Sequence, residues 1–391
     1  MKLWEKEYKL NKQIEEFTIG DDYILDAKLI SYDCIASIAH TQMLGKISIL
    51  KKSEVKKIVS VLNDIIKMDA IGKFKISKEQ EDSHTAIEEY LVKKLGSVGK
   101  KIHTARSRND QVLVALRLYY KDELLACKIL AEEFIHVLQN FIEKYEDVKL
   151  PGYTHMRKAM PSNISMFSNS FIDSMKDNLK LVDSAIGLVD QSPLGAAAGY
   201  GTPIEIDKEF VANMLQFSKV QENPIYTQNS RGKFEATILH SLSQIMFDLN
   251  KLASDIILFS MPEFGYFNLP KDICTGSSIM PHKKNPDVLE LVRAKYHIVV
   301  SYEFQIKELT SHLISGYHRD LQLTKKPVME GIDITKSSIS IMNPVISNMK
   351  VDKQKCKKAL SKEIFATEEV HKLVKKGMPF REAYGIIAKK F

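Results

Sequence analysis

The chain has 391 residues, 44% of them hydrophobic and 27% charged, which is the composition of a soluble globular protein with more than one structural region. No apolar run approaches the ~20 residues of a membrane span, so the sequence excludes a membrane-spanning helix. The formal net charge is +7, but lysines alternate with glutamates, which argues against a nucleic-acid-binding stripe and favours a small anionic ligand.

Targeting segments and cysteine motifs are not evident in the sequence. The first residues, 1–8, are charged and lack the apolar core of a signal peptide. The four cysteines are widely scattered and form no Cys-x-x-Cys pair and no metal-ligand cluster. We therefore expect a cytoplasmic protein with reduced thiols and without a metal site.

Helical periodicity is the main secondary-structure signal, and the low content of glycine (17) and proline (12) favours long helices. Apolar residues recur at three- and four-residue spacing over 55–66, 124–142 and 242–257. Ser53 is the predicted cap of the first of these helices, and Leu125 and Ile129 belong to the predicted apolar face of the second. Because strand-like alternation is scarce, we expect an all-α protein with a bundle of long helices at its centre.

The polar string 81–88 precedes an apolar helix face that Gly96 should end. Thr85 and the glutamate three residues later fit a capping box, although Asp82 could cap the same helix. Capping does not explain His84. We therefore treat His84 and Thr85 as candidates for ligand binding.

The string 101–111 is dense in hydrogen-bond donors and leads into a buried helical segment. Asn109 or Asp110 is the predicted N-cap of that helix. The planar guanidinium of Arg108 and the amide of Asn109, next to a helix N-terminus, suit carboxylate recognition. The alternative is a helix cap with ordinary surface arginines.

Pro151 and Gly152 predict a turn after the helix that ends near 145, and His155 then opens the next segment. A lone histidine is more often a structural residue than a catalyst, so its residue type leaves both roles open. Thr154, beside it, offers a hydroxyl to a substrate carboxylate.

The loop 275–286 combines two hydroxyls and two ammonium groups around a flexible glycine, from Gly276, Ser277, Ser278, Lys283 and Lys284. Asn285 is a predicted N-cap, and Pro286 suits the first helical position. A mobile cationic loop beside a helix N-terminus is suited to hold an anionic substrate.

The string 317–325 follows a break at Gly316. If this string is helical, Gln322 and Lys325 are three residues apart and share one face, so both could reach one ligand. The alternative is a surface helix with ordinary polar residues.

In chain order, these strings resemble those of the argininosuccinate lyases, a branch of the fumarase/aspartase superfamily. The loop has the superfamily pattern Gly-Ser-Ser-x-Met-Pro-x-Lys-x-Asn at 276–285. The strings at 103–111 and 317–325 are typical of this branch, and 32–39 is similar to the family's first substrate segment. The resemblance covers essentially the whole chain.

The resemblance implies a three-region helical subunit: an N-terminal helical domain at 1–102, a central helix-bundle domain at 103–345 and a short C-terminal helical region at 346–391. It also implies a homotetramer in which segments of three chains form each active site. The implied reaction is the reversible cleavage of argininosuccinate to arginine and fumarate. This is the last step of arginine biosynthesis, and it uses no metal or organic cofactor.

By resemblance, Ser277 and His155 are the acid–base pair, and Glu290 raises the basicity of His155. Lys283 holds the fumarate-side carboxylates. The implied substrate-binding residues are Ser37, His84, Thr85, Arg108, Asn109, Thr154, Ser278, Asn285, Tyr317, Gln322 and Lys325. Reference pKa values favour His155 as the base, whereas the resemblance favours Ser277 as the base and His155 as the acid, which is the assignment we adopt.

Two alternative functions stay open. His282 stands where this branch usually has glutamine and is similar to the adenylosuccinate lyases, so a fumarate-releasing lyase acting on adenylosuccinate or aspartate is one alternative. A catalytically silent structural homologue is the other, since related proteins serve as lens crystallins. The presence of all the residues assigned to catalysis favours an active enzyme.

Overall fold

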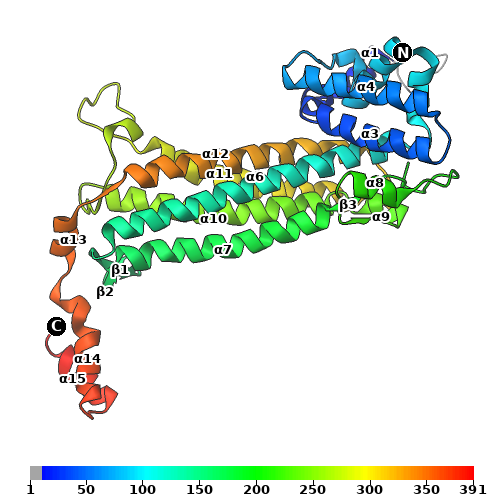
Figure 1. Cartoon of the computed structure of the whole chain (residues 1–391). Coiled ribbons are helices and arrows are strands. Elements are labelled where there is room, and N and C mark those ends of the chain that lie inside the picture. Colours follow the sequence, from blue (N-terminus) through cyan, green and yellow to red (C-terminus); the bar gives the residue numbers. More distant parts are fainter. Residues whose placement is uncertain (1–10) are drawn as a thin grey trace. The chain divides into compact units, whose positions relative to one another are not determined.

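The computed structural model describes residues 11–391, and helices make up most of this part of the chain (Figure 1). The segment 1–8, on which the expectation about a signal peptide rests, lies outside the described residues. The longest helices are α6 (Arg108–Tyr145), α7 (Ile164–Val189), α10 (Lys233–Ser260), α11 (Asp287–Thr310) and α12 (Lys325–Asn348). The shorter helices are α1 (Lys12–Ile19), α2 (Asp22–Leu25), α3 (Ile30–Lys46), α4 (Lys52–Ala70), α5 (Ser83–Leu95), α8 (Lys208–Met214), α9 (Pro224–Asn229), α13 (Lys353–Ala359), α14 (Ala366–Lys375) and α15 (Phe380–Ala388). The expected all-α class is confirmed.

The strands of the described residues are short and pair only in twos. An antiparallel hairpin consists of β1 (Lys149–Thr154) and β2 (Arg157–Asn163). The other pairs are the parallel β3 (Gln191–Ser192) with β4 (Lys219–Val220) and the antiparallel β5 (Phe267–Asn268) with β6 (Lys350–Val351).

The chain divides into two compact units. Unit 1 contains the described residues up to Ala126 together with Val182–Ser241 and Ser301–Ile332, and unit 2 contains Cys127–Leu181, Leu242–Val300 and Asp333–Phe391. Each of the five longest helices contributes residues to both units, because the boundaries fall inside these helices. The division into three regions, at 102 and 345, stays a prediction.

The N-terminal helices of unit 1 form their own hydrophobic core. In α4, Ile58, Leu62 and Ile65 are fully buried against apolar residues of α3, which lies beside it (Figure 1). The helix begins at Lys52, so the prediction of Ser53 as its cap is wrong. The glutamate at the third helical position accepts a hydrogen bond from the backbone N–H of Lys51 (2.9 Å), which stabilises the helix start one residue before Ser53.

A buried arginine joins α6 to the segment 182–241 of unit 1. Arg117 of α6 is 1% exposed. Its guanidinium donates to the carbonyl oxygen of Gln191 (2.6 Å), to the Ser230 hydroxyl (3.3 Å) and to the Gln221 side chain. Burial lowers the pKa of Arg117 to about 9, so the arginine stays charged at neutral pH and these acceptors compensate its desolvation.

In unit 2, α7 and α10 lie side by side and share a buried polar contact (Figure 1). Asp248 accepts hydrogen bonds from Ser174 (2.7 Å) and Asn178 (2.6 Å) across the two helices. The apolar stripe 242–257 of α10 is buried as expected, except that Ile257 at its end is only half-buried. In α6, however, Leu125 and Ile129 are 44% and 56% exposed, so their placement on the buried face is wrong. Spacing predicts a helix face but does not decide how wide the buried stripe is.

The C-terminal helices α14 and α15 form a small hairpin within unit 2. Its buried core consists of Val370, Ala383 and Ile387. Within residues 11–391, no helix is both long enough and apolar enough to cross a membrane.

Candidate active site

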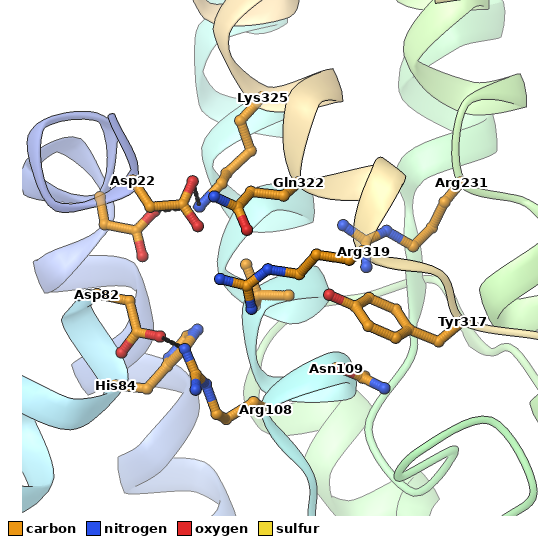
Figure 2. A pocket seen from close by; sticks show the side chains of 12 residues that line it. Asp22, Asp82, His84, Arg108, Asn109, Arg231, Tyr317, Arg319, Gln322 and Lys325 are labelled. Carbon is orange, nitrogen blue, oxygen red and sulfur yellow. Dashed lines mark hydrogen bonds and ion pairs between the residues drawn. The ribbon is translucent and has the colours of Figure 1, made fainter. Parts of the chain in front are cut away.

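A polar pocket in unit 1 brings together residues from five distant parts of the chain (Figure 2). Its lining contains six of the predicted substrate-binding residues: His84, Arg108, Asn109, Tyr317, Gln322 and Lys325. It also contains residues to which the sequence analysis gave no binding role: Asp22, Asp26, Asp82, Val112, Arg231 and Arg319. The pocket therefore presents carboxylates and cations together, as a ligand with charges of both signs requires.

The start of α5 places Asp82 and His84 at the pocket. Asp82 is the N-cap, because its Oδ1 accepts the backbone N–H of Thr85 (2.8 Å), and Gly96 ends the helix as expected. The capping box predicted to begin at Thr85 is wrong, since Thr85 is already the third residue of the helix. Asp82 also pairs with the guanidinium of Arg108, which fixes that side chain at the pocket wall. Thr85 is buried.

The start of α6 places Arg108 and Asn109. The helix begins at Arg108, and the Ser107 hydroxyl accepts the N–H of Asn109 (3.3 Å). The side chain of Asp110 in turn accepts a hydrogen bond from the backbone N–H of Ser107 (2.9 Å). The prediction of Asn109 or Asp110 as the N-cap is therefore wrong, because Ser107 takes this position. The amide of Asn109 is then not used for capping and lines the pocket.

Asp110 has a second structural role. It is fully buried, and its Oδ2 accepts the backbone N–H groups of Gly195 (3.2 Å) and Ala197 (2.8 Å). Burial raises the pKa of Asp110. The small-residue segment around 195 is thereby attached to the helix start that carries Arg108 and Asn109.

A buried ammonium group lies between two carboxylates at another wall of the pocket (Figure 2). Lys325 is 2% exposed and its Nζ lies 2.8 Å from Asp22 and 2.6 Å from Asp26. Burial acts to lower the pKa of Lys325, but Asp26 and Asp22 raise it overall, so the lysine is charged. Burial raises the pKa of Asp22 to about 6, against the opposing attraction of Lys325.

The segment before α12 supplies the remaining wall. The 3₁₀-helix η5 (Arg319–Thr324) buries Leu321 and directs Gln322 to the same pocket as Lys325. Gln322 donates to the carbonyl oxygens of Thr18 (3.2 Å) and Ile19 (3.0 Å), which connects this wall to the end of α1. The adjacent Tyr317 ring lies beneath the guanidinium carbon of Arg231, at 5.5 Å from its centroid (Figure 2).

Ser37 does not line the pocket. It is fully buried in α3, where its hydroxyl donates to Asp33 (3.3 Å) and accepts from Arg106 (2.9 Å). Asp33 in turn accepts from the Nδ1 of His84 (2.5 Å). Ser37 is thus joined to the pocket through a hydrogen-bond network that contains His84.

The remaining predicted residues belong to unit 2, and His155 lies at a strained turn there. Pro151 and Gly152 are within strand β1, so the predicted turn at these residues is wrong. The chain turns at His155 and Met156, whose φ angles are +53° and +57°. Positive φ at two successive residues is what a two-residue hairpin requires, but it strains residues other than glycine. Thr154 and His155 are exposed at this turn.

The loop 275–286 is closed at its base. The backbone groups of Thr275 and Asn285 exchange two hydrogen bonds (3.0 and 2.9 Å), and the Asn285 amide donates to the carbonyl oxygen of Gly276 (3.1 Å). Because α11 begins at Asp287 and Asn285 bonds to the loop, the prediction of Asn285 as the N-cap is wrong, and Pro286 precedes the helix instead of opening it. The Ser277 hydroxyl oxygen accepts the N–H of Met280 (3.1 Å). Ser278, Lys283 and Glu290 are exposed.

The pocket residues that the sequence analysis missed had only weak signals. Asp22 and Asp26 are four residues apart, a spacing that is also common for acidic residues on a solvated helix face. Arg319 lies within the string 317–325, where its residue type alone did not indicate a binding role. Arg231 follows a short polar segment that carries no motif. Only the pairing with Lys325, far away in the chain, distinguishes the two acids from surface residues.

Comparisons with known proteins agree with one another. A family model described as lyase matches residues 1–300. The chain is 55% identical over 390 residues to an argininosuccinate lyase of Thermotoga neapolitana, with 100% of this chain and 98% of that protein covered. It is 39% identical over 383 residues to one of Bacteroides thetaiotaomicron, with 98% and 86% covered.

Solved structures share the fold at lower identity. An EDDS lyase in complex with formate superposes with a TM-score of 0.80 at 23% identity, over 97% of this chain and 76% of that one. A class II fumarase from Schistosoma mansoni superposes with a TM-score of 0.80 at 15% identity, over 94% and 90%. At these identities the likeness concerns the fold.

Proposed function

Since the chain belongs to the argininosuccinate lyase family, we propose that it catalyses the reversible β-elimination of argininosuccinate to arginine and fumarate. This makes it a carbon–nitrogen lyase of arginine biosynthesis. The structural observation that best supports the proposal is the polar pocket of unit 1. Six residues that were predicted to bind substrate, from separate sequence strings, lie together there. Argininosuccinate bears carboxylates, an ammonium and a guanidinium, and this pocket offers partners to each of these charges.

The elimination needs a base, an acid and stabilisation of negative charge. The proton to be removed is on the carbon beside a carboxylate, and its loss creates a carbanion with charge delocalised onto that carboxylate. The C–N bond then breaks, its electron pair stays on the guanidine nitrogen, and the double bond of fumarate forms. Fixed cations and N–H dipoles aimed at the developing charge contribute most of the rate enhancement in such reactions. We assign this role to Lys283 and Asn285.

We assign Ser277 as the base and His155 as the acid, with Glu290 supporting His155. Two observations support these assignments. The Ser277 oxygen accepts backbone N–H groups of Ile279 (3.4 Å) and Met280 (3.1 Å), and donors of this kind favour the alkoxide over the hydroxyl. His155 is held at positive φ, and such strain is concentrated at functional sites.

We further propose a homotetramer with active sites that several chains build together. Large apolar side chains on the long helices are exposed in the single chain, including Phe247 (44%), Leu291 (61%), Ile298 (41%), Phe304 (64%) and Ile341 (41%). Exposed apolar side chains in this number on bundle helices support the proposal that another subunit covers this surface. In this assembly, Ser277 and His155 reach the unit 1 pocket of other chains. We also propose a cytoplasmic location and a small-molecule substrate, without nucleic acid or cofactor.

A substrate panel tests the proposed reaction. Purified protein is supplied with argininosuccinate, adenylosuccinate or aspartate, and the ultraviolet absorbance of fumarate is recorded. Fumarate release from argininosuccinate, and its loss in Ser277→Ala, is the expected result. Release only from one of the other two substrates would replace the function by that of a different lyase, and no release from any would indicate the silent homologue.

Mixing two inactive variants tests the shared site. Ser277→Ala and His155→Asn subunits are combined after reversible dissociation, and activity is measured. Partial recovery is expected if the two residues that form one site come from different chains. Absence of recovery, after mass spectrometry has verified mixed tetramers, would refute the shared site while leaving the reaction untouched.

A further inference from the structure

The imidazole of His84 has one nitrogen bound and the other without a partner. The side chain is 3% exposed and lines the pocket beside Arg108 and Asp82 (Figure 2). Its Nδ1 lies 2.5 Å from a carboxylate oxygen of Asp33, whereas its Nε2 is buried and has no hydrogen-bond partner. A buried polar atom that is left unpaired costs about 1–3 kcal/mol, so its persistence at a pocket calls for a ligand.

Asp33 is held in place by several donors. This residue of α3 is fully buried, and one oxygen accepts the amide of Gln111 (2.9 Å) and the hydroxyl of Ser37 (3.3 Å). The other oxygen accepts the hydroxyl of Ser83 (3.1 Å) together with His84. A carboxylate that accepts from every side is ionised, so the proton of the contact with His84 is on Nδ1.

The groups around His84 decide its charge. Three carboxylates face it, from Asp33, Asp82 and Asp26, and they raise the pKa of His84 although its burial acts to lower it. Burial acts to raise the pKa of Asp33, but His84 and Arg106 together hold it below its usual range. The nearby cations are Arg106, which acts on Asp33, and Arg108, which pairs with Asp82. Burial and Arg106 lower the pKa of His103 to about 4. With Nδ1 bound to a carboxylate, a charged imidazole presents Nε2 as an N–H donor.

We propose that Asp33 is a positioning residue that acts through His84, and that the Nε2–H of His84 donates a hydrogen bond to a carboxylate of the substrate. An anionic acceptor is required because the imidazolium repels the ammonium and guanidinium groups of the same ligand. The nearby guanidinium of Arg108, and that of Arg319 farther along the pocket, favour the same sign of ligand charge. The identity of the carboxylate rests on the proposed reaction, whereas the role of Asp33 does not.

A double-mutant cycle on KM tests this role. His84→Gln removes the charge, and we expect it to raise KM for argininosuccinate about tenfold to a hundredfold with a smaller change in kcat, as for the loss of a charged hydrogen bond. Asp33→Asn should raise KM in the same way. The KM of the double variant should be no higher than that of His84→Gln, because Asp33 acts through His84. Effects that multiply in the double variant would overturn the proposal.

The pH dependence separates positioning from a merely structural effect. In Asp33→Asn, the pKa of His84 should fall, because burial then acts against fewer carboxylates, so KM should lie nearest the wild-type value at low pH and rise as the pH increases. The wild type should lack this additional rise. Asp33→Glu, which keeps the charge, should restore most of the affinity. An Asp33→Asn profile parallel to that of the wild type would refute the argument.

Nitrogen NMR of histidine-labelled protein tests the charge state without any substrate. The ring signals that disappear in His84→Gln identify His84, and in the wild type they should show a predominantly charged ring at pH ~6.5, where an ordinary histidine is only half charged. A neutral ring there would overturn the proposal even if Asp33→Asn failed to fold. If the His84 ring is charged but the protein is inactive toward argininosuccinate, the result would instead count against the proposed reaction. Product inhibition identifies the carboxylate that His84 binds. If fumarate or arginine inhibits His84→Gln more weakly than the wild type, that product carries the carboxylate. If both products inhibit the variant and the wild type equally, the proposed contact is refuted.

Discussion

Replacing Asp110 with asparagine tests how the binding end of α6 is held. The carboxylate is fully buried and accepts three backbone N–H groups, from Ser107 (2.9 Å), Gly195 (3.2 Å) and Ala197 (2.8 Å). In Asp110→Asn, only one side-chain oxygen remains an acceptor. The amide group can replace the oxygen that faces Ser107, and the N–H of Ser107 then faces another donor.

The expected loss of stability follows from this count. One buried N–H without an acceptor costs about 1–3 kcal/mol. Because burial raises the pKa of Asp110, its charge is itself unfavourable, and removing it offsets part of this loss. We therefore expect Asp110→Asn to lower the free energy of unfolding by about 1–2 kcal/mol. Asp110→Ala, which leaves all three N–H groups unpaired, should lower it at least twice as much.

Urea denaturation followed by circular dichroism measures the stability, and fumarate release measures the activity. KM should rise severalfold in Asp110→Asn with little change in kcat, because Arg108 and Asn109 belong to the helix start that the substitution loosens. Asp147→Asn is the matched control, since it removes the same charge from an exposed position. An Asp110→Asn protein as stable as this control, with unchanged KM, would refute the reasoning.

Three further changes are expected to act on stability. Asp22 binds its proton more tightly in the native state than in the unfolded chain, with a pKa of about 6 instead of 3.8. The free energy of unfolding should therefore fall as pH rises between these values, and Asp22→Asn should remove that fall. An unchanged pH dependence of the urea midpoint in this variant would contradict the prediction. Met156→Gly should raise the thermal midpoint by relieving a φ of +57°, a gain of about 1 kcal/mol, and a lower midpoint would contradict the strain. Gly331→Ala would place a Cβ 2.5 Å from the Leu239 side chain and should cost about 1–3 kcal/mol despite the better helix former. Gly187→Ala, with no atom within 4 Å, is its control and should be neutral or stabilising, and equal effects on the urea midpoint would disprove overpacking.

Helix starts show where local reasoning fails. Ser53, Thr85, Asn109 and Asn285 are good capping residues, yet each helix uses a different cap or start. Several capping candidates stand within three residues of one another at each of these starts. At α5 the capping residue Asp82 also pairs with Arg108, so a tertiary contact favours it over Thr85. Local propensity is a weak prior when tertiary contacts compete for the same groups.

The turn at His155 has a related cause. Pro151 and Gly152 are strong turn residues, but they lie in a strand whose register is irregular between Pro151 and Tyr153. The hairpin turns at two residues that turn statistics would not select. Their positive φ is sustained by the pairing of the two strands, which the turn propensities of single residues do not reflect.

Periodicity was enough to establish that the chain is helical and that its long helices have apolar faces, and local polar strings predicted which segments carry binding groups. These properties depend on neighbours three or four residues apart, so they can be read along the chain. The folded chain was needed to establish that Lys325 lies between Asp22 and Asp26, that Asp33 holds His84, and that Leu125 is exposed. Burial and charge pairing depend on groups far apart in the chain, and their free energies arise only when the fold removes both partners from water.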